Sequence, residues 1–112
     1  EANRNAVGAK EFEMMKNSAI LLNVARGEVV DENALDAALK AEELRYAVLD
    51  VQSQEPPKED YPLYKNEKVI LTPHMASNTE ECMGRMALHA AMQIHKVLSG
   101  GQPDWPVNHP KF

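Results

Sequence analysis

The chain has 112 residues and a formal net charge of -5, with 44% hydrophobic and 26% charged side chains. This composition is ordinary for a soluble globular domain and argues against disordered and fibrous classes. The acidic balance and the lack of a Lys/Arg cluster argue against nucleic acid as a partner, and no apolar run reaches membrane-spanning length.

The first half of the chain predicts a helix, a strand, a second helix and a second strand. Phe12 and Met15 lie at amphipathic spacing in a predicted helix over residues 9–16, and the apolar run 19–24 predicts a strand buried on both faces. Asp31 is the expected N-cap of a helix that ends near Lys40. Residues 46–49 read as a second buried strand, so this stretch predicts a right-handed βαβ unit.

The second half begins with a long connection, residues 51–67, that is rich in proline and has no period, which indicates a functional loop. A third strand over 68–71 leads into Thr72-Pro73-His74. Asn78 to Glu81 predicts a capping box that opens the longest helix, with a wide apolar stripe and Gly100-Gly101 at its end. Residues 102–112 are expected to form an extended arm that docks on another surface.

The cysteine content and the start of the chain bear on its location and completeness. Cys82 is the single cysteine, so no internal disulfide forms, and its spacing from Met83 and Met86 predicts a buried apolar thiol. No charged-then-apolar leader is seen, which favours a cytoplasmic protein without a membrane partner. Because the chain begins at Glu1 without methionine, we expect a fragment of a larger protein.

Polar residues follow each of the three predicted strands. Arg26, Asp50 and His74 occupy the strand ends, and Glu55 lies five residues after Asp50. In an open parallel α/β sheet, ligands bind outside the carboxyl ends of the strands. Arg26 suits a carboxylate, and His74 can carry a proton while a nearby acid such as Glu55 holds its ring.

Each of these residues also has a plain structural interpretation. Arg26 can be a solvated cation, Asp50 a turn former, Glu55 a loop charge and His74 a structural histidine. His89 and His95 are six residues apart on the long helix, which is not the spacing of a metal pair, so no metal site is predicted. No Ser-His-Asp, Cys-x-x-Cys or phosphate-binding glycine motif is present.

Several blocks occur in the order and spacing of a known family. They are Asn23-Val24-Ala25-Arg26-Gly27 with Val29-Val30-Asp31-Glu32 and Ala34-Leu35, then Leu49-Asp50-Val51 with Glu55-Pro56, then Thr72-Pro73-His74. The chain from about residue 9 to the end of the long helix resembles the NAD(P)-dependent D-isomer-specific 2-hydroxyacid dehydrogenases. These include phosphoglycerate dehydrogenases and glyoxylate/hydroxypyruvate reductases.

The resemblance implies roles for individual residues. Arg26 would bind the substrate carboxylate, and Glu55 and His74 would form a proton relay, which makes these three the expected catalytic residues. The cofactor, NAD or NADP, would be contacted by Ala25, Arg26, Asp50, His74 and Ala76. Hydride would pass between the nicotinamide and a 2-keto or 2-hydroxy acid while His74 transfers the proton.

The resemblance also implies a fold class and its limits. We expect an α/β fold, the second half of a Rossmann-type doubly wound parallel sheet with about three strands and a long C-terminal helix, within a larger two-domain protein. Residues 1–101 would form the C-terminal half of the nucleotide-binding domain, and residues 102–112 a tail. The Gly-x-Gly-x-x-Gly turn is missing here, so we expect the fragment alone to be inactive and the full-length protein to be a homodimer.

One alternative function is kept beside the dehydrogenase. Relatives of this fold exist that mainly sense nucleotides or recruit protein partners, so a nucleotide-sensing or protein-binding module is the second hypothesis. The identity of the 2-hydroxy acid and the choice between NAD and NADP depend on segments that these residues do not contain.

Overall fold

The structure, a computed structural model, describes residues 2–108 and divides the chain into two compact units, Glu1–Ala76 and Ser77–Phe112. His109 and the end of the predicted arm, residues 109–112, lie outside the described residues. The prediction that a nucleotide-binding domain extends to residue 101 stays a prediction.

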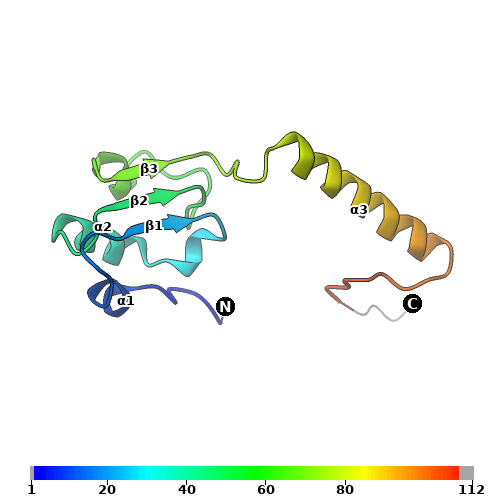
Figure 1. Cartoon of the computed structure of the whole chain (residues 1–112), viewed down its shortest axis with the longest axis horizontal. Helices are drawn as coiled ribbons and strands as arrows, with labels where there is room; N and C mark the ends of the chain where they lie inside the picture. The colour runs from blue at the N-terminus through cyan, green and yellow to red at the C-terminus, as the bar shows by residue number, and fades with distance from the viewer. Residues whose placement is uncertain (1, 109–112) are drawn as a thin grey trace. The chain divides into compact units, whose positions relative to one another are not determined.

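The first unit is built on a parallel sheet of three strands, in the order β1 (Ile20–Asn23), β2 (Tyr46–Leu49), β3 (Val69–Leu71) (Figure 1). Asn23 pairs with Leu49, and Leu49 pairs with Leu71, so the three strands end in register. The predicted α/β fold with a three-stranded parallel half-sheet is therefore confirmed, and polar residues that follow these strands emerge at one edge.

One face of the sheet joins a hydrophobic core with α1 (Ala9–Glu13) and α2 (Glu32–Lys40). This core is formed by Phe12, Val30, Leu35, Ala38, Leu39, Leu44, Ala47, Leu49 and Leu63. On the same strands Ile20, Leu22 and Ile70 are exposed. The prediction of strands buried on both faces is thus wrong for the first unit taken by itself, because alternate side chains of a strand point to opposite faces and this unit covers only one of them.

The ends of the two helices follow local capping chemistry. Asp31 accepts hydrogen bonds from the backbone N–H groups of Asn33 (3.1 Å) and Ala34 (3.0 Å), which confirms it as the N-cap of α2. The predicted helix over residues 9–16 is shorter in the structure and ends at Glu13. Its last turn is tightened by a hydrogen bond from the Met15 N–H to the Phe12 carbonyl, 2.9 Å.

Two short 3₁₀ helices lie in the connections of the first unit. The first, η1 (Gly27–Val29), follows β1. The second, η2 (Pro62–Lys65), lies within the long loop that leads to β3, and it buries Leu63. The loop after β2 is therefore partly ordered by its own 3₁₀ turn, although the sequence shows no period there.

The second unit consists of α3 (Glu80–Leu98) and the segment after it. The N-cap of α3 is Thr79, whose hydroxyl accepts a hydrogen bond from the Cys82 N–H at 3.2 Å. The N3 position therefore holds Cys82, and a capping box needs an acid or amide there. The predicted capping box from Asn78 to Glu81 is wrong. No residue of α3 is buried within the described chain, and Cys82 is half-exposed rather than buried. No helix among residues 2–108 combines the length and hydropathy needed to span a membrane.

The start of the predicted arm folds onto α3. Asp104 binds the side chains of Gln93 and Lys96, and its own N–H donates to the Gln93 side chain at 2.7 Å. Trp105 lies against His89, with ring centroids 5.9 Å apart. Gly100 has a φ of 84°, a conformation that suits glycine just after a helix end.

Candidate active site at the strand ends

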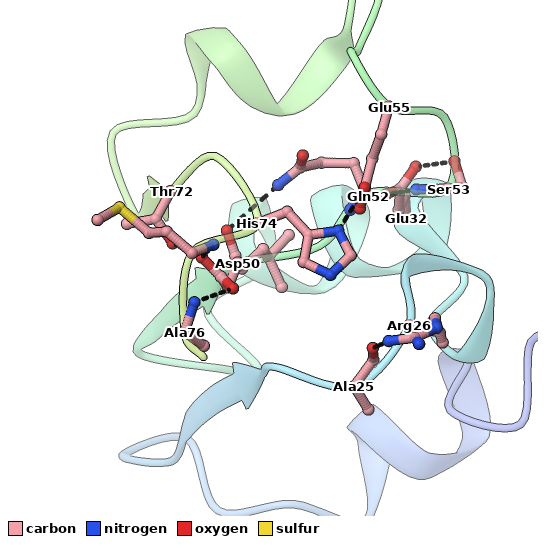
Figure 2. Close-up of polar contacts among 12 residues, drawn as sticks. Ala25, Arg26, Glu32, Asp50, Gln52, Ser53, Glu55, Thr72, His74 and Ala76 are labelled. Atoms are coloured by element: carbon pink, nitrogen blue, oxygen red, sulfur yellow. Dashed lines mark hydrogen bonds and ion pairs between the residues drawn. The ribbon is translucent and has the colours of Figure 1, made fainter. Parts of the chain in front are cut away.

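The in-register strand ends bring the predicted site residues into one region of the first unit (Figure 2). Arg26, Glu55 and His74 line one hollow, together with Gly27, Glu28, Gln52 and Ser53. Asp50 lies beside it, at the end of the central strand. The two residues that the sequence predicts as a relay therefore share a hollow with the predicted carboxylate-binding arginine.

Glu55 and His74 are in direct contact. The His74 Nδ1 lies 2.6 Å from Glu55 Oε2, and the other carboxylate oxygen of Glu55 accepts the Gln52 N–H at 3.0 Å. The hydrogen bond to His74 and then the one from Gln52 lower the pKa of Glu55, so this carboxyl is ionised at neutral pH. With Nδ1 held by a carboxylate, Nε2 is the nitrogen left to exchange a proton with a ligand.

The backbone of His74 has an unusual conformation that its neighbours hold in place. Its φ is 50°, in the left-handed region of backbone conformation that residues other than glycine rarely adopt. The His74 N–H donates to the Asp50 carbonyl at 2.8 Å. Such conformations persist where the surroundings over-determine them, and they often occur at functional sites.

The Asp50 carboxylate fastens both sides of this turn. It accepts hydrogen bonds from the Thr72 hydroxyl (2.5 Å) and from the backbone N–H groups of Met75 (2.9 Å) and Ala76 (2.7 Å). These bonds, that of Thr72 first, lower the pKa of Asp50. Asp50 is therefore a charged anchor that fixes the direction in which His74 leaves the sheet.

Arg26 and Ala25 are placed by the side chain at the end of β1. The Asn23 amide donates to the Arg26 carbonyl at 3.0 Å, and its oxygen accepts the Ala25 N–H at 3.0 Å. The Arg26 guanidinium donates to the Ala25 carbonyl at 2.6 Å. Within the described residues this is its one hydrogen bond, so most of its planar fork remains available for an anion such as a carboxylate.

Gly27 allows two loops of the site to touch. A Cβ at this position would lie 1.9 Å from the carbonyl carbon of Gln52 and 2.1 Å from its oxygen. Only glycine permits this approach of the chain after β1 to the chain after β2. The contact holds Arg26 close to the loop that carries Glu55.

Thr72, Ser53 and Glu32 contribute to the site without being sequence candidates, as Asn23 and Gln52 also do. The Thr72 hydroxyl donates a hydrogen bond to Asp50. Its position directly before Pro73-His74 is a sequence signal from which a role at the site could be predicted. Ser53 donates to Glu32 from its N–H (2.8 Å) and from its hydroxyl (2.5 Å). These two residues are 21 positions apart, so no local pattern links them.

The residues around Asp50 fit a bound nicotinamide. A carboxylate offers about four lone-pair positions, and Asp50 uses three of them for hydrogen bonds within residues 2–108. The carboxylate therefore keeps acceptor capacity for an amide N–H. Ala25 and Ala76, which have small side chains, lie in the turns that follow the two neighbouring strands.

Comparison with known proteins agrees with this arrangement. The family described as "D-isomer specific 2-hydroxyacid dehydrogenase, NAD binding domain" matches residues 1–76. A D-3-phosphoglycerate dehydrogenase of Methanocaldococcus jannaschii is 44% identical over 97% of this chain and 21% of its own length. Glyoxylate/hydroxypyruvate reductase B of Cronobacter sakazakii is 46% identical over 84% of this chain and 29% of its own.

A solved structure gives the same result in three dimensions. The D-isomer specific 2-hydroxyacid dehydrogenase from Xanthobacter autotrophicus, in complex with NADPH and MES, superposes with a TM-score of 0.81 and 33% identity. The match covers 96% of this chain and 43% of that one. The chain belongs to the D-isomer specific 2-hydroxyacid dehydrogenase family, and it spans less than a third of the length of the two curated relatives.

Proposed function

We propose that the full-length protein is an NAD- or NADP-dependent oxidoreductase that interconverts D-2-hydroxy acids and 2-keto acids. The observation that carries the proposal is the contact of His74 Nδ1 with Glu55 at 2.6 Å, in a hollow that Arg26 also lines. Anion binder, proton carrier and orienting acid together suit a reaction on a small carboxylate. The relatives' names support this class of substrate.

The proposed roles of the three residues follow from their chemistry. Arg26 holds the substrate carboxylate, so that the keto group lies toward His74. In the reduction direction the nicotinamide cofactor, when bound, would supply the hydride that the keto carbon receives. Protonated His74 gives its Nε2 proton to the keto oxygen, while Glu55 holds the ring and balances its charge. The product is the 2-hydroxy acid.

We also propose the cofactor contacts. Asp50 would accept a hydrogen bond from the carboxamide of the nicotinamide, and Ala25, Arg26, His74 and Ala76 would line its position. The family's description names NAD, and the Xanthobacter relative was solved with NADPH, which supports either dinucleotide as the cofactor.

The test is a steady-state assay of the full-length protein with NADH or NADPH and a panel of 2-keto acids that includes glyoxylate and hydroxypyruvate. His74→Ala should abolish turnover and leave cofactor affinity largely unchanged. Turnover that survives this change would show that His74 is not the proton carrier. The 112-residue chain alone should show no micromolar binding in a fluorescence titration with NADH.

Two further properties are part of the proposal. The single cysteine, Cys82, fits a reducing compartment, which supports a cytoplasmic location. The resemblance to the family supports a homodimer for the full-length protein, and light scattering after size exclusion measures its mass.

The second hypothesis, a nucleotide-sensing or protein-binding module, is not favoured by relatives that are named as dehydrogenases and reductases.

A further inference from the structure

Glu32, the first residue of α2, holds the loop that follows β2. Its two carboxylate oxygens accept hydrogen bonds from Ser53, one from the backbone N–H at 2.8 Å and one from the hydroxyl at 2.5 Å (Figure 2). A carboxylate that accepts two bonds from one residue fixes both the position and the direction of that residue's backbone. The loop is thus tied to the rigid start of a helix.

The fixed residue lies next to the one that holds Glu55. Gln52, which directly precedes Ser53, donates its N–H to Glu55 Oε1 at 3.0 Å. The opposite oxygen of the same carboxylate contacts His74 at 2.6 Å. A continuous series of contacts therefore leads from Glu32 through the Gln52-Ser53 backbone to the His74 ring.

The loop has a second restraint on its other side. Gln52 is 7% exposed, and its side-chain amide donates to the Leu49 carbonyl at 3.3 Å. Gly27 lies close to the Gln52 carbonyl, and this contact prevents the loop after β2 from moving toward the chain after β1. These two restraints act on Gln52. The hydrogen bonds to Glu32 fix Ser53, the residue after Gln52, and therefore the path of the chain toward Glu55.

We propose that Glu32 is a positioning residue of the active site: through Ser53 it holds the loop that presents Glu55 to His74. The inference rests on the proposed function for its catalytic consequence, and on the geometry alone for the coupling between Glu32 and Glu55. Glu32 touches neither His74 nor a reacting atom. Its effect is on the orientation of the imidazole during proton transfer.

The experiment uses the full-length protein and the variants Glu32→Ala, Glu32→Gln and Ser53→Ala. In Glu32→Ala we expect kcat to fall on the order of tenfold, since small displacements of a catalytic group are costly, while the KM for NADH stays unchanged. Glu32→Gln keeps one acceptor oxygen and should restore part of the loss. Ser53→Ala leaves α2 intact and should give a smaller loss of the same kind.

A second measurement separates positioning from general stability. The contact with His74 is the main cause that lowers the pKa of Glu55, so a loosened loop should raise that pKa toward its ordinary value. The pKa of Asp50 is lowered first by Thr72 and the turn after β3, with the charge of His74 as the last contributor, so it should move less than that of Glu55. Carboxyl-carbon NMR follows both titrations in one sample, and Glu59→Gln, an exposed acid of the same loop, is the matched control.

The outcomes are distinct. If Glu32→Ala lowers the melting temperature but leaves kcat and the Glu55 titration unchanged, Glu32 only stabilises the start of α2 and the proposal is wrong. If the wild-type protein reduces no 2-keto acid, the proposed function fails. In that case the titration of Glu55 still tests whether Glu32 is coupled to Glu55, because this measurement does not depend on turnover.

Discussion

Ionisation of Glu55 links the candidate site to pH. The hydrogen bond from His74, followed by that from the Gln52 N–H, lowers the pKa of Glu55 below its ordinary value of 4.5. A group whose pKa is lowered by folding stabilises the protein above its unfolded pKa, and this contribution is lost as pH falls through the folded pKa. The pair is partly exposed, which keeps the effect on stability small.

We therefore predict that Glu55→Gln is less stable than the wild type at neutral pH and that the difference shrinks in acid, below the folded pKa of Glu55. The midpoints of urea unfolding of the full-length wild type and variant, at neutral pH and at a pH below the folded pKa of Glu55, measure the difference in stability. Glu59→Gln should show no such pH dependence. An equal difference for Glu55→Gln at both pH values would contradict the assigned role of the carboxylate.

Asp50 provides the second prediction at the residue level. Asp50→Asn replaces one acceptor oxygen by an NH₂ group, which leaves a backbone N–H of the turn without a partner and releases His74 from its position. We expect a lower melting temperature and a loss of kcat on the order of a hundredfold. Thr72→Val removes one donor and keeps the carboxylate, so its effect should be smaller.

At the level of elements, the close contact between the turn after β1 and the loop after β2 depends on Gly27. We predict that Gly27→Ala destabilises the full-length protein by about 1–3 kcal/mol, since the atoms that a Cβ would meet are backbone and cannot turn aside. Activity should fall as well, because Arg26 would move away from Glu55 and His74.

Gly84→Ala is the matched control for this substitution. A Cβ at Gly84, in the interior of α3, meets no atom of the described chain within 4 Å apart from its two chain neighbours and the backbone of its own helix. Alanine should stabilise the helix by about 0.5–1 kcal/mol relative to glycine. Chemical denaturation of both variants compares them directly, and equal effects would contradict the role assigned to Gly27.

The sequence predicts the elements whose signals are local. Asp31 and the apolar spacing after it predict α2, and polar residues after apolar runs predict the strand ends with Arg26, Asp50 and His74. The reach of Ser53 to Glu32 is not predictable in this way, because it depends on how the loop folds over the helix. The capping box predicted for α3 begins one residue before the N-cap, Thr79, because Asn78 and Thr79 are both favourable N-cap residues.

At the level of the whole molecule, the burial of the strands is what the sequence predicts least well. Continuous apolar runs predict cover on both faces, yet Ile20, Leu22 and Ile70 are more than half exposed on one face of the sheet. The chain spans less than a third of the length of its curated relatives. A contiguous exposed apolar face on an open sheet favours association with other chains.

We predict that the isolated 112-residue chain self-associates through this face. Leu22→Lys places a charge on this face, on the edge strand β1, and should shift the chain toward the monomer, because burial of an unpaired ammonium between two sheets is unfavourable. Sedimentation velocity over a range of concentrations measures the change. Gln54→Lys adds the same charge at an exposed loop position and should leave association unchanged. An isolated chain that stays monomeric without the lysine would contradict the prediction and would show that the uncovered face is tolerated in water.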